Sequence, residues 1–190
     1  MPSLTLWNEN NTLWLLFSLY FVAGMRHRIQ VKRSVPLPSF ERVCLLLVTA
    51  LLFFPRTHLS FLAIRFHSSY AIALTGFILT ILGLAFSAWA RDVLGRNWSG
   101  RVIIQVDHQL ITAGPYAYIR HPLYTGLLTA LTGITLVSAD FGSLLGLFLA
   151  VNIFRFKAYR EEQILEAEFG AGYTVYRAYT GGILPRIAHI

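Results

Sequence analysis

The chain has 190 residues, of which 55% are hydrophobic and only 13% charged, and its mean hydropathy is +0.56. Soluble domains carry roughly a quarter charged residues, so this composition excludes an ordinary soluble domain. The net charge of +7 does not indicate nucleic-acid binding, because the basic residues flank apolar runs as they do in membrane proteins. The length predicts a single domain, residues 1–190.

Five apolar segments predict membrane-spanning helices, at about 12–25, 40–54, 70–90, 122–138 and 141–156. A span needs roughly 20 residues, so the first two segments are short. Pro122 fits the first turn of a helix, and the brief link after Ser138 predicts an antiparallel helical hairpin. We expect an all-α, polytopic membrane helix bundle of about five transmembrane helices. Three spans fall in residues 1–90, and the last two fall in residues 91–190 with a C-terminal helical tail.

The basic residues predict the orientation. Of the 16 lysines and arginines, only Arg56 and Arg65 lie on the side of the membrane opposite the others. The positive-inside rule then places the N-terminus outside and the C-terminus in the cytoplasm, which requires an odd number of spans. The link over 91–121 and the tail from Lys157 onward share the cytoplasmic side.

The sequence gives no indication of a disulfide, a zinc site, a removable signal peptide or C-terminal prenylation. Cys44 is the only cysteine, so no intrachain disulfide forms, and no set of cysteines and histidines suggests a zinc site. The N-terminus lacks the basic region and cleavage site of a removable signal peptide. No C-terminal prenylation box is present.

Two charged clusters are candidates for chemistry. In the first, Arg120 and His121 stand at the start of a helix, whose unpaired N–H groups favour an anion. Anchoring at lipid headgroups explains that cluster equally well. In the second, Lys157, Glu161 and Glu162 continue the fifth span as a helix to about residue 169, where a solvated face with a weak ion pair is the simpler interpretation.

The two clusters gain meaning together. The hairpin of the last two spans puts His121 and Glu161 on the same membrane face, where they can be neighbours. Ionised carboxylates accept hydrogen bonds from hydroxyls, so Glu161 and Glu162 could bind a ribose diol. A zwitterionic cofactor with a ribose would fit this combination.

The second half of the chain resembles the isoprenylcysteine carboxyl methyltransferase family over residues 94–186. The resemblance is carried by LGRNWSGRVIIQVDHQLITAGPYAYIRHPLYTG, then K-x-x-x-E-E, F-G-x-x-Y-x-x-Y and a closing L-P. It implies an enzyme that uses S-adenosyl-L-methionine, with the long link and the tail closing a cytoplasmic cofactor pocket. It also implies a lipophilic or prenylated substrate from the bilayer.

The resemblance also implies roles for individual residues. The cofactor-binding positions would be Gln105, His108, Gln109, Leu110, Ile111, Tyr116, Arg120, His121, Pro122, Leu123, Tyr124 and Glu161. Lys157 stands where eukaryotic members of the family place a substrate-holding arginine. A lysine is a point charge without a bidentate fork, so it would recognise a carboxylate less strictly.

The acceptor decides whether a base is needed. A carboxylate is already ionised near neutral pH, so its methylation requires alignment rather than deprotonation. An amine acceptor would need a base, for which Glu162 or His121 are the candidates. The leading hypothesis is therefore O-methylation of a prenylated or other lipophilic carboxylate, with Lys157 orienting the acceptor. The alternatives are a phospholipid N-methyltransferase or a thiol S-methyltransferase and, outside the enzymes, a small transporter or a structural membrane subunit.

Overall fold

Six α-helices and two short strands make up the described part of the chain. The structure is a computed structural model that describes residues 2–23, 31–34, 39–53, 64–95, 103–105 and 109–186. In chain order the elements are α1 (Pro2–Ala23), β1 (Val31–Ser34), α2 (Ser39–Phe53), α3 (Tyr70–Leu94), β2 (Ile103–Gln105), the 3-10 turn η3 (Gly114–Ala117), α4 (Pro122–Ser138), α5 (Phe141–Phe169) and α6 (Ala171–Tyr179).

Local chemistry fixes the helix ends. Ser69 caps α3, since its hydroxyl accepts a hydrogen bond from the Ile72 N–H at 3.3 Å. Asp140 caps α5 in the same way through the Ser143 N–H at 2.8 Å. Between α4 and α5, Ala139 adopts a left-handed φ of 48°, and its carbonyl accepts the Phe66 N–H. These contacts make the α4–α5 link a tight turn, as the sequence predicted.

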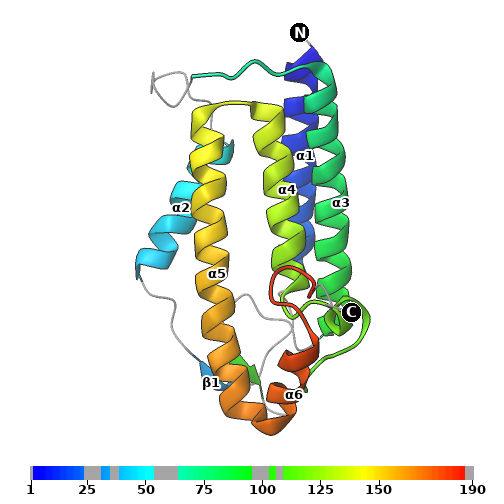
Figure 1. Cartoon of the computed structure of the whole chain (residues 1–190). Helices are drawn as coiled ribbons and strands as arrows, with labels where there is room; N and C mark the ends of the chain where they lie inside the picture. The colour runs from blue at the N-terminus through cyan, green and yellow to red at the C-terminus, as the bar shows by residue number, and fades with distance from the viewer. Residues whose placement is uncertain are drawn as a thin grey trace.

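Helices α1, α3 and α4 stand side by side, and α5 runs beside α4 with α2 on its other side (Figure 1). One buried apolar cluster joins α2, α4 and α5 through Val48, Leu52, Leu131, Ile134 and Ala150. A second joins α1, α3 and α4 through Leu6, Ala73 and Val137. Helix α4 contributes to both clusters, so it is the centre of the bundle.

Helices α3 and α4 approach so closely that their backbones touch. A Cβ added at Gly83 would lie 2.5 Å from the Gly126 carbonyl oxygen, and one at Gly76 would lie 2.6 Å from the Gly133 oxygen. The Ser87 hydroxyl donates to the Leu123 carbonyl across the same contact at 3.0 Å. Close contacts between small residues and hydrogen bonds from hydroxyl groups are typical of helices that associate within a membrane.

The outside of the bundle is apolar. Large side chains such as Leu16, Leu46, Leu82 and Phe148 are 58%, 70%, 59% and 64% exposed. Helices α3 and α5 are long and apolar enough to cross a bilayer, and α4 is an apolar helix of 17 residues. Exposed apolar side chains on several helices of the bundle suit contact with lipid.

The structure confirms a helical architecture with a helix at each of the five apolar segments, and it extends several of them. Helix α1 begins at Pro2 and α3 continues to Leu94, past the expected residue 90. The number of spans stays a prediction, because only α3 and α5 meet the length and hydropathy of a span among the described helices.

The sequence did not predict the two-stranded sheet. Strands β1 and β2 pair antiparallel, with Val31 opposite Gln105 and Ser34 opposite Ile103. Runs of three or four residues are too short to show alternation, so only the pairing of two distant links reveals them.

The close contact of α3 and α4 predicts a sharp difference between two glycines. Gly83→Ala should destabilise the protein by about 1–3 kcal/mol, because its Cβ would overlap backbone that cannot move without separating the helices. Gly172→Ala is the control, because nothing lies within 4 Å of its added Cβ. Thermal unfolding in detergent measures both. Equal melting temperatures for the two variants would contradict the contact.

Candidate functional site

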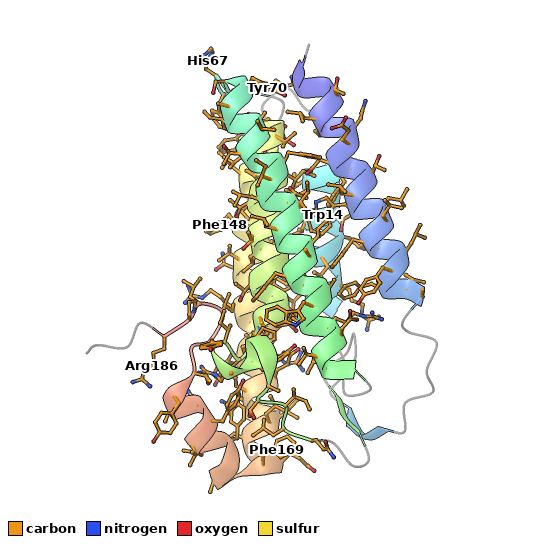
Figure 2. All side chains as sticks on the ribbon, turned by 90° about the vertical axis from the view of Figure 1, so that its right-hand side faces the viewer. Trp14, His67, Tyr70, Phe148, Phe169 and Arg186 are labelled. Carbon is orange, nitrogen blue, oxygen red and sulfur yellow. The ribbon has the colours of Figure 1, made fainter. Side chains whose placement is uncertain are left out.

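The candidate site lies at one end of the bundle, where α4 begins and α5 runs on beyond it. Helix α5 has 29 residues, about 43 Å at 1.5 Å per residue, whereas a bilayer core is about 30 Å thick. Its last turns, which carry Glu161 and Glu162, therefore project past the apolar part. Phe169 and Arg186 mark this end, and His67 and Tyr70 mark the opposite end (Figure 2).

Glu162 is the centre of a buried charge network. Its Oε1 accepts from Arg120 Nε at 2.8 Å and lies 3.1 Å from His121 Nε2. The side chains of Arg120 and Glu162 are each 12% exposed. Arg177 Nε approaches the other oxygen at 3.8 Å. Charges buried to this degree persist only when they are paired and hydrogen-bonded, as these are.

Glu161 belongs to the same network through different partners. The Tyr124 hydroxyl donates to its Oε1, and His121 Nδ1 lies 3.4 Å from its Oε2. The Tyr124 ring stacks on His121, with ring centroids 5.7 Å apart, and on Phe154 at 5.0 Å. The Glu161 side chain is 26% exposed, so it is the more accessible of the two carboxylates.

The network sets the protonation of its members. Burial alone would lower the pKa of His121, but hydrogen bonds with Glu161 and Glu162 raise it above its usual 6.5. Burial would likewise raise the pKa of Glu162, yet the hydrogen bonds from His121 and Arg120 lower it to about 2. The two carboxylates therefore favour the protonated form of His121.

The C-terminal segment closes over the start of α4. The Arg120 N–H donates to the Gly181 carbonyl at 2.8 Å, and the Gly181 N–H returns a bond to the Tyr118 carbonyl at 3.0 Å. Arg120 Nη1 also donates to the carbonyls of Arg177 and Thr180. Arg120 therefore links the segment after α6 to the start of α4. Its N–H groups donate to carbonyls of α6 and of that segment, and to Glu162.

The 3-10 turn η3 places Tyr116 beneath this segment. Gly114 starts η3 with a backbone φ of +58°, a conformation that residues other than glycine rarely adopt. Tyr116 is 6% exposed, and its carbonyl accepts from the Tyr176 hydroxyl of α6 at 2.7 Å. Burial raises the pKa of Tyr116 and of Tyr173, so both hydroxyls stay neutral.

Lys157 lies beside the network. Its Nζ is 5.8 Å from the centre of the Tyr124 ring. The same Nζ is 3.9 Å from Glu41 Oε1, at the start of α2. Glu41 is fully buried and also lies 3.4 Å from Arg160 Nη1.

The structure brings together most of the site residues expected from the sequence. Arg120, His121, Tyr124, Glu161 and Glu162 form one network. His121 and Glu161 are neighbours in it, as the predicted hairpin led us to expect. Pro122 is buried at the helix start and Leu123 is half-buried beside it.

The expected adenine-binding segment is described only in part. Gln109 is exposed, and Leu110 and Ile111 are half-buried, in irregular backbone before η3. Gln105 lies on β2, paired in register with Val31. His108 lies outside the described residues.

Sequence reasoning missed several residues around the site. Tyr173 and Arg177 belong to α6, and Gly181 follows it; the family's F-G-x-x-Y-x-x-Y pattern marked this region without assigning roles. Glu41 was missed as well, although it is the only acidic residue between Glu9 and Asp92. An isolated acid in an apolar half-chain is itself a signal of function.

Fold and site together define the class of protein. It is an apolar helical bundle with a buried charge network between the start of α4 and the last turns of α5. Residues 74–167 match the isoprenylcysteine carboxyl methyltransferase (ICMT) family. Over these residues the chain is similar to members of this family. The matched residues include α4 and the charged end of α5, which carry the network, but end before α6.

Two relatives agree with this similarity. The chain is 32% identical over 131 residues to a protein-S-isoprenylcysteine O-methyltransferase of Schizosaccharomyces pombe. That alignment covers 67% of this chain and 55% of the relative, so the chain spans about half the length of the curated protein that it matches. In fold it resembles the eukaryotic intramembrane Ras methyltransferase ICMT, with a TM-score of 0.60, 24% identity, 80% of this chain covered and 55% of the other.

The protonated state of His121 predicts a pH dependence of stability. Because the folded-state pKa is raised, protonation favours the folded state; this stabilisation is complete below about pH 6.5 and is lost as pH rises through the raised pKa. The melting temperature in detergent should therefore fall between about pH 6.5 and alkaline pH. His121→Gln should be less stable at low pH and lack this slope. His67→Gln, at an exposed position in the opposite end, should keep it. An unchanged slope in His121→Gln would contradict the assignment.

Proposed function

We propose that the protein is an integral membrane methyltransferase that uses S-adenosyl-L-methionine to form the methyl ester of a prenylated or otherwise lipophilic carboxylate. The observation that carries this proposal is the buried network of Arg120, Glu162, His121, Glu161 and Tyr124, located in the part of the chain that matches the family. The names of the two relatives supply the reaction and the prenylated class of acceptor.

The hydrogen-bonding groups around the start of α4 and the end of α5 suit S-adenosylmethionine. Glu161 is a partly accessible carboxylate, which suits the hydroxyls of a ribose or an ammonium group. The Tyr173 hydroxyl is fully buried and has no hydrogen-bond partner among the described residues, so it is free to bond a ligand. We assign the cofactor to the space between residues 109–111, Tyr116, the start of α4 and Glu161. S-adenosylmethionine supplies a methyl group on a positively charged sulfur that departs as a neutral thioether.

The state of the network favours a carboxylate as the acceptor. The raised pKa of His121 favours its protonated form, and the lowered pKa of Glu162, which His121 and Arg120 bind, makes it a weak base. Both groups are therefore poorly suited to take a proton from an amine. A carboxylate acceptor needs no base, and its methylation depends on alignment with the methyl group. Carboxyl O-methylation is therefore favoured over phospholipid N-methylation.

The chain's surface supports a multi-pass arrangement in the bilayer. The exposed leucines of α1, α2 and α3 would face lipid, and the site would lie at the cytoplasmic end with the C-terminus. We propose five spans, α1 to α5, with the N-terminus outside. A lipophilic acceptor would reach the site from the membrane, with Lys157 binding its carboxylate.

Removing the accessible carboxylate should weaken cofactor binding. Glu161→Gln should bind S-adenosylhomocysteine about 10- to 100-fold more weakly than wild type, since hydrogen bonds to a charged group contribute about 1.5–3 kcal/mol. Equilibrium binding to purified protein in detergent or lipid measures this. The matched control is Glu166→Gln, which removes an equal charge five residues further along α5 and should bind normally. If folded wild-type protein fails to bind, the proposed function is wrong.

Lys157 should affect the acceptor more than the cofactor. Lys157→Met keeps most of the side-chain volume but removes the charge, so the KM for an S-farnesylcysteine carboxylate should rise about tenfold. Affinity for S-adenosylhomocysteine should change less than twofold. Transfer of a labelled methyl group gives the KM, and titration gives the affinity. Equal losses in both would contradict the acceptor role.

A further inference from the structure

Glu41 is a buried acid that neither helix packing nor the proposed cofactor binding explains. It lies in the first turn of α2, and its side chain is 0% exposed. Placing an ionised carboxylate in an apolar bundle is costly unless it is well paired. Its partners therefore indicate what it does.

Those partners are two cations of α5, and they hold Glu41 loosely. Lys157 Nζ lies 3.9 Å from Oε1, and Arg160 Nη1 lies 3.4 Å from Oε2. Charge-assisted bonds between nitrogen and carboxylate normally measure about 2.7–2.9 Å. Oε1 has no hydrogen-bond partner among the described residues. The carboxylate thus neutralises charge without saturated hydrogen bonds, which makes it an exchangeable counter-ion.

The same cations adjoin the candidate site. The Lys157 and Arg160 side chains are 12% and 19% exposed, so both are shielded from bulk water. Lys157 also lies over the Tyr124 ring, whose hydroxyl donates to Glu161. An acceptor carboxylate that binds Lys157 must therefore share it with Glu41 or displace Glu41 from it.

We propose that Glu41 is an internal counter-ion of the acceptor site, and that the acceptor carboxylate competes with it for Lys157 and Arg160. This inference rests on the proposed function and adds a specificity-determining residue to it. Before the acceptor binds, Glu41 compensates the two buried cations. When an acidic acceptor arrives, its carboxylate takes over part of that role.

The charge balance of the reaction gives Glu41 a second effect. An oxygen lone pair of the acceptor carboxylate bonds to the methyl carbon, and the carbon–sulfur bond breaks with its electron pair going to sulfur. No proton moves, and the acceptor carboxylate becomes a neutral ester. The ester has no charge with which to compete, so Glu41 regains both cations and favours release of the product over the substrate.

The test compares binding of an acid with binding of its ester. N-acetyl-S-farnesylcysteine and its methyl ester are titrated into detergent-solubilised protein without a methyl donor. Glu41→Gln keeps the shape of the side chain but removes its charge, so it should bind the acid about tenfold more tightly than wild type does and the ester equally well. Glu168→Gln, which removes the charge of an exposed acid near the end of α5, should change neither affinity.

A second variant guards against failure of the first to fold. Glu41→Asp keeps the charge but reaches the cations less well, so its affinity for the acid should lie between those of wild type and Glu41→Gln. A weaker or unchanged affinity for the acid in either variant overturns the proposal, as does an equal shift for acid and ester. If wild type binds S-adenosylhomocysteine and the acid but the variants show no change, only the role of Glu41 fails. If wild type binds neither ligand, the proposed function fails.

Discussion

The backbone contact between α3 and α4 is the constraint on which the rest of the bundle depends. Gly76 and Gly83 of α3 meet Gly133 and Gly126 of α4 at distances that exclude a Cβ, so these two helices have essentially one way to pack. Helix α4 then lies in the middle and contributes to both buried apolar clusters. Because His121 directly precedes α4, this contact also fixes the position of the candidate site.

The α4–α5 hairpin brings the charged residues of α5 to the start of α4. A tight turn at Ala139 and Asp140 makes α5 return along α4, so the charged end of α5 reaches the start of α4. Two carboxylates there bind an arginine and a histidine, and each charge is compensated where water is scarce. The segment around Gly181 adds backbone hydrogen bonds to Arg120 and covers the network.

The charged side chains of the candidate site lie at one end of the bundle, and they form two adjoining groups. The group around Glu162 includes contacts of 2.8 and 3.1 Å to one carboxylate oxygen and is suited to hold its shape. The group around Glu41 and Lys157 is paired at longer distances and is suited to exchange partners. The proposed reaction, in which an anion binds and a neutral ester leaves, would use both properties: a rigid region for the cofactor and an adjustable one for the acceptor.

The sequence by itself determined the helices and the end at which the candidate site lies, because apolar length, the Asp140 cap, Pro122 in the first turn of α4 and the flanking charges act locally. It also placed His121 near Glu161, since a short turn leaves a hairpin little choice. Only the tertiary structure decided the pairing of β1 with β2, the return of Gly181 to Tyr118 and the partners of Glu41. Glu41 and Arg160 are 119 positions apart, and no local pattern encodes a contact that exists only after α2 packs against α5.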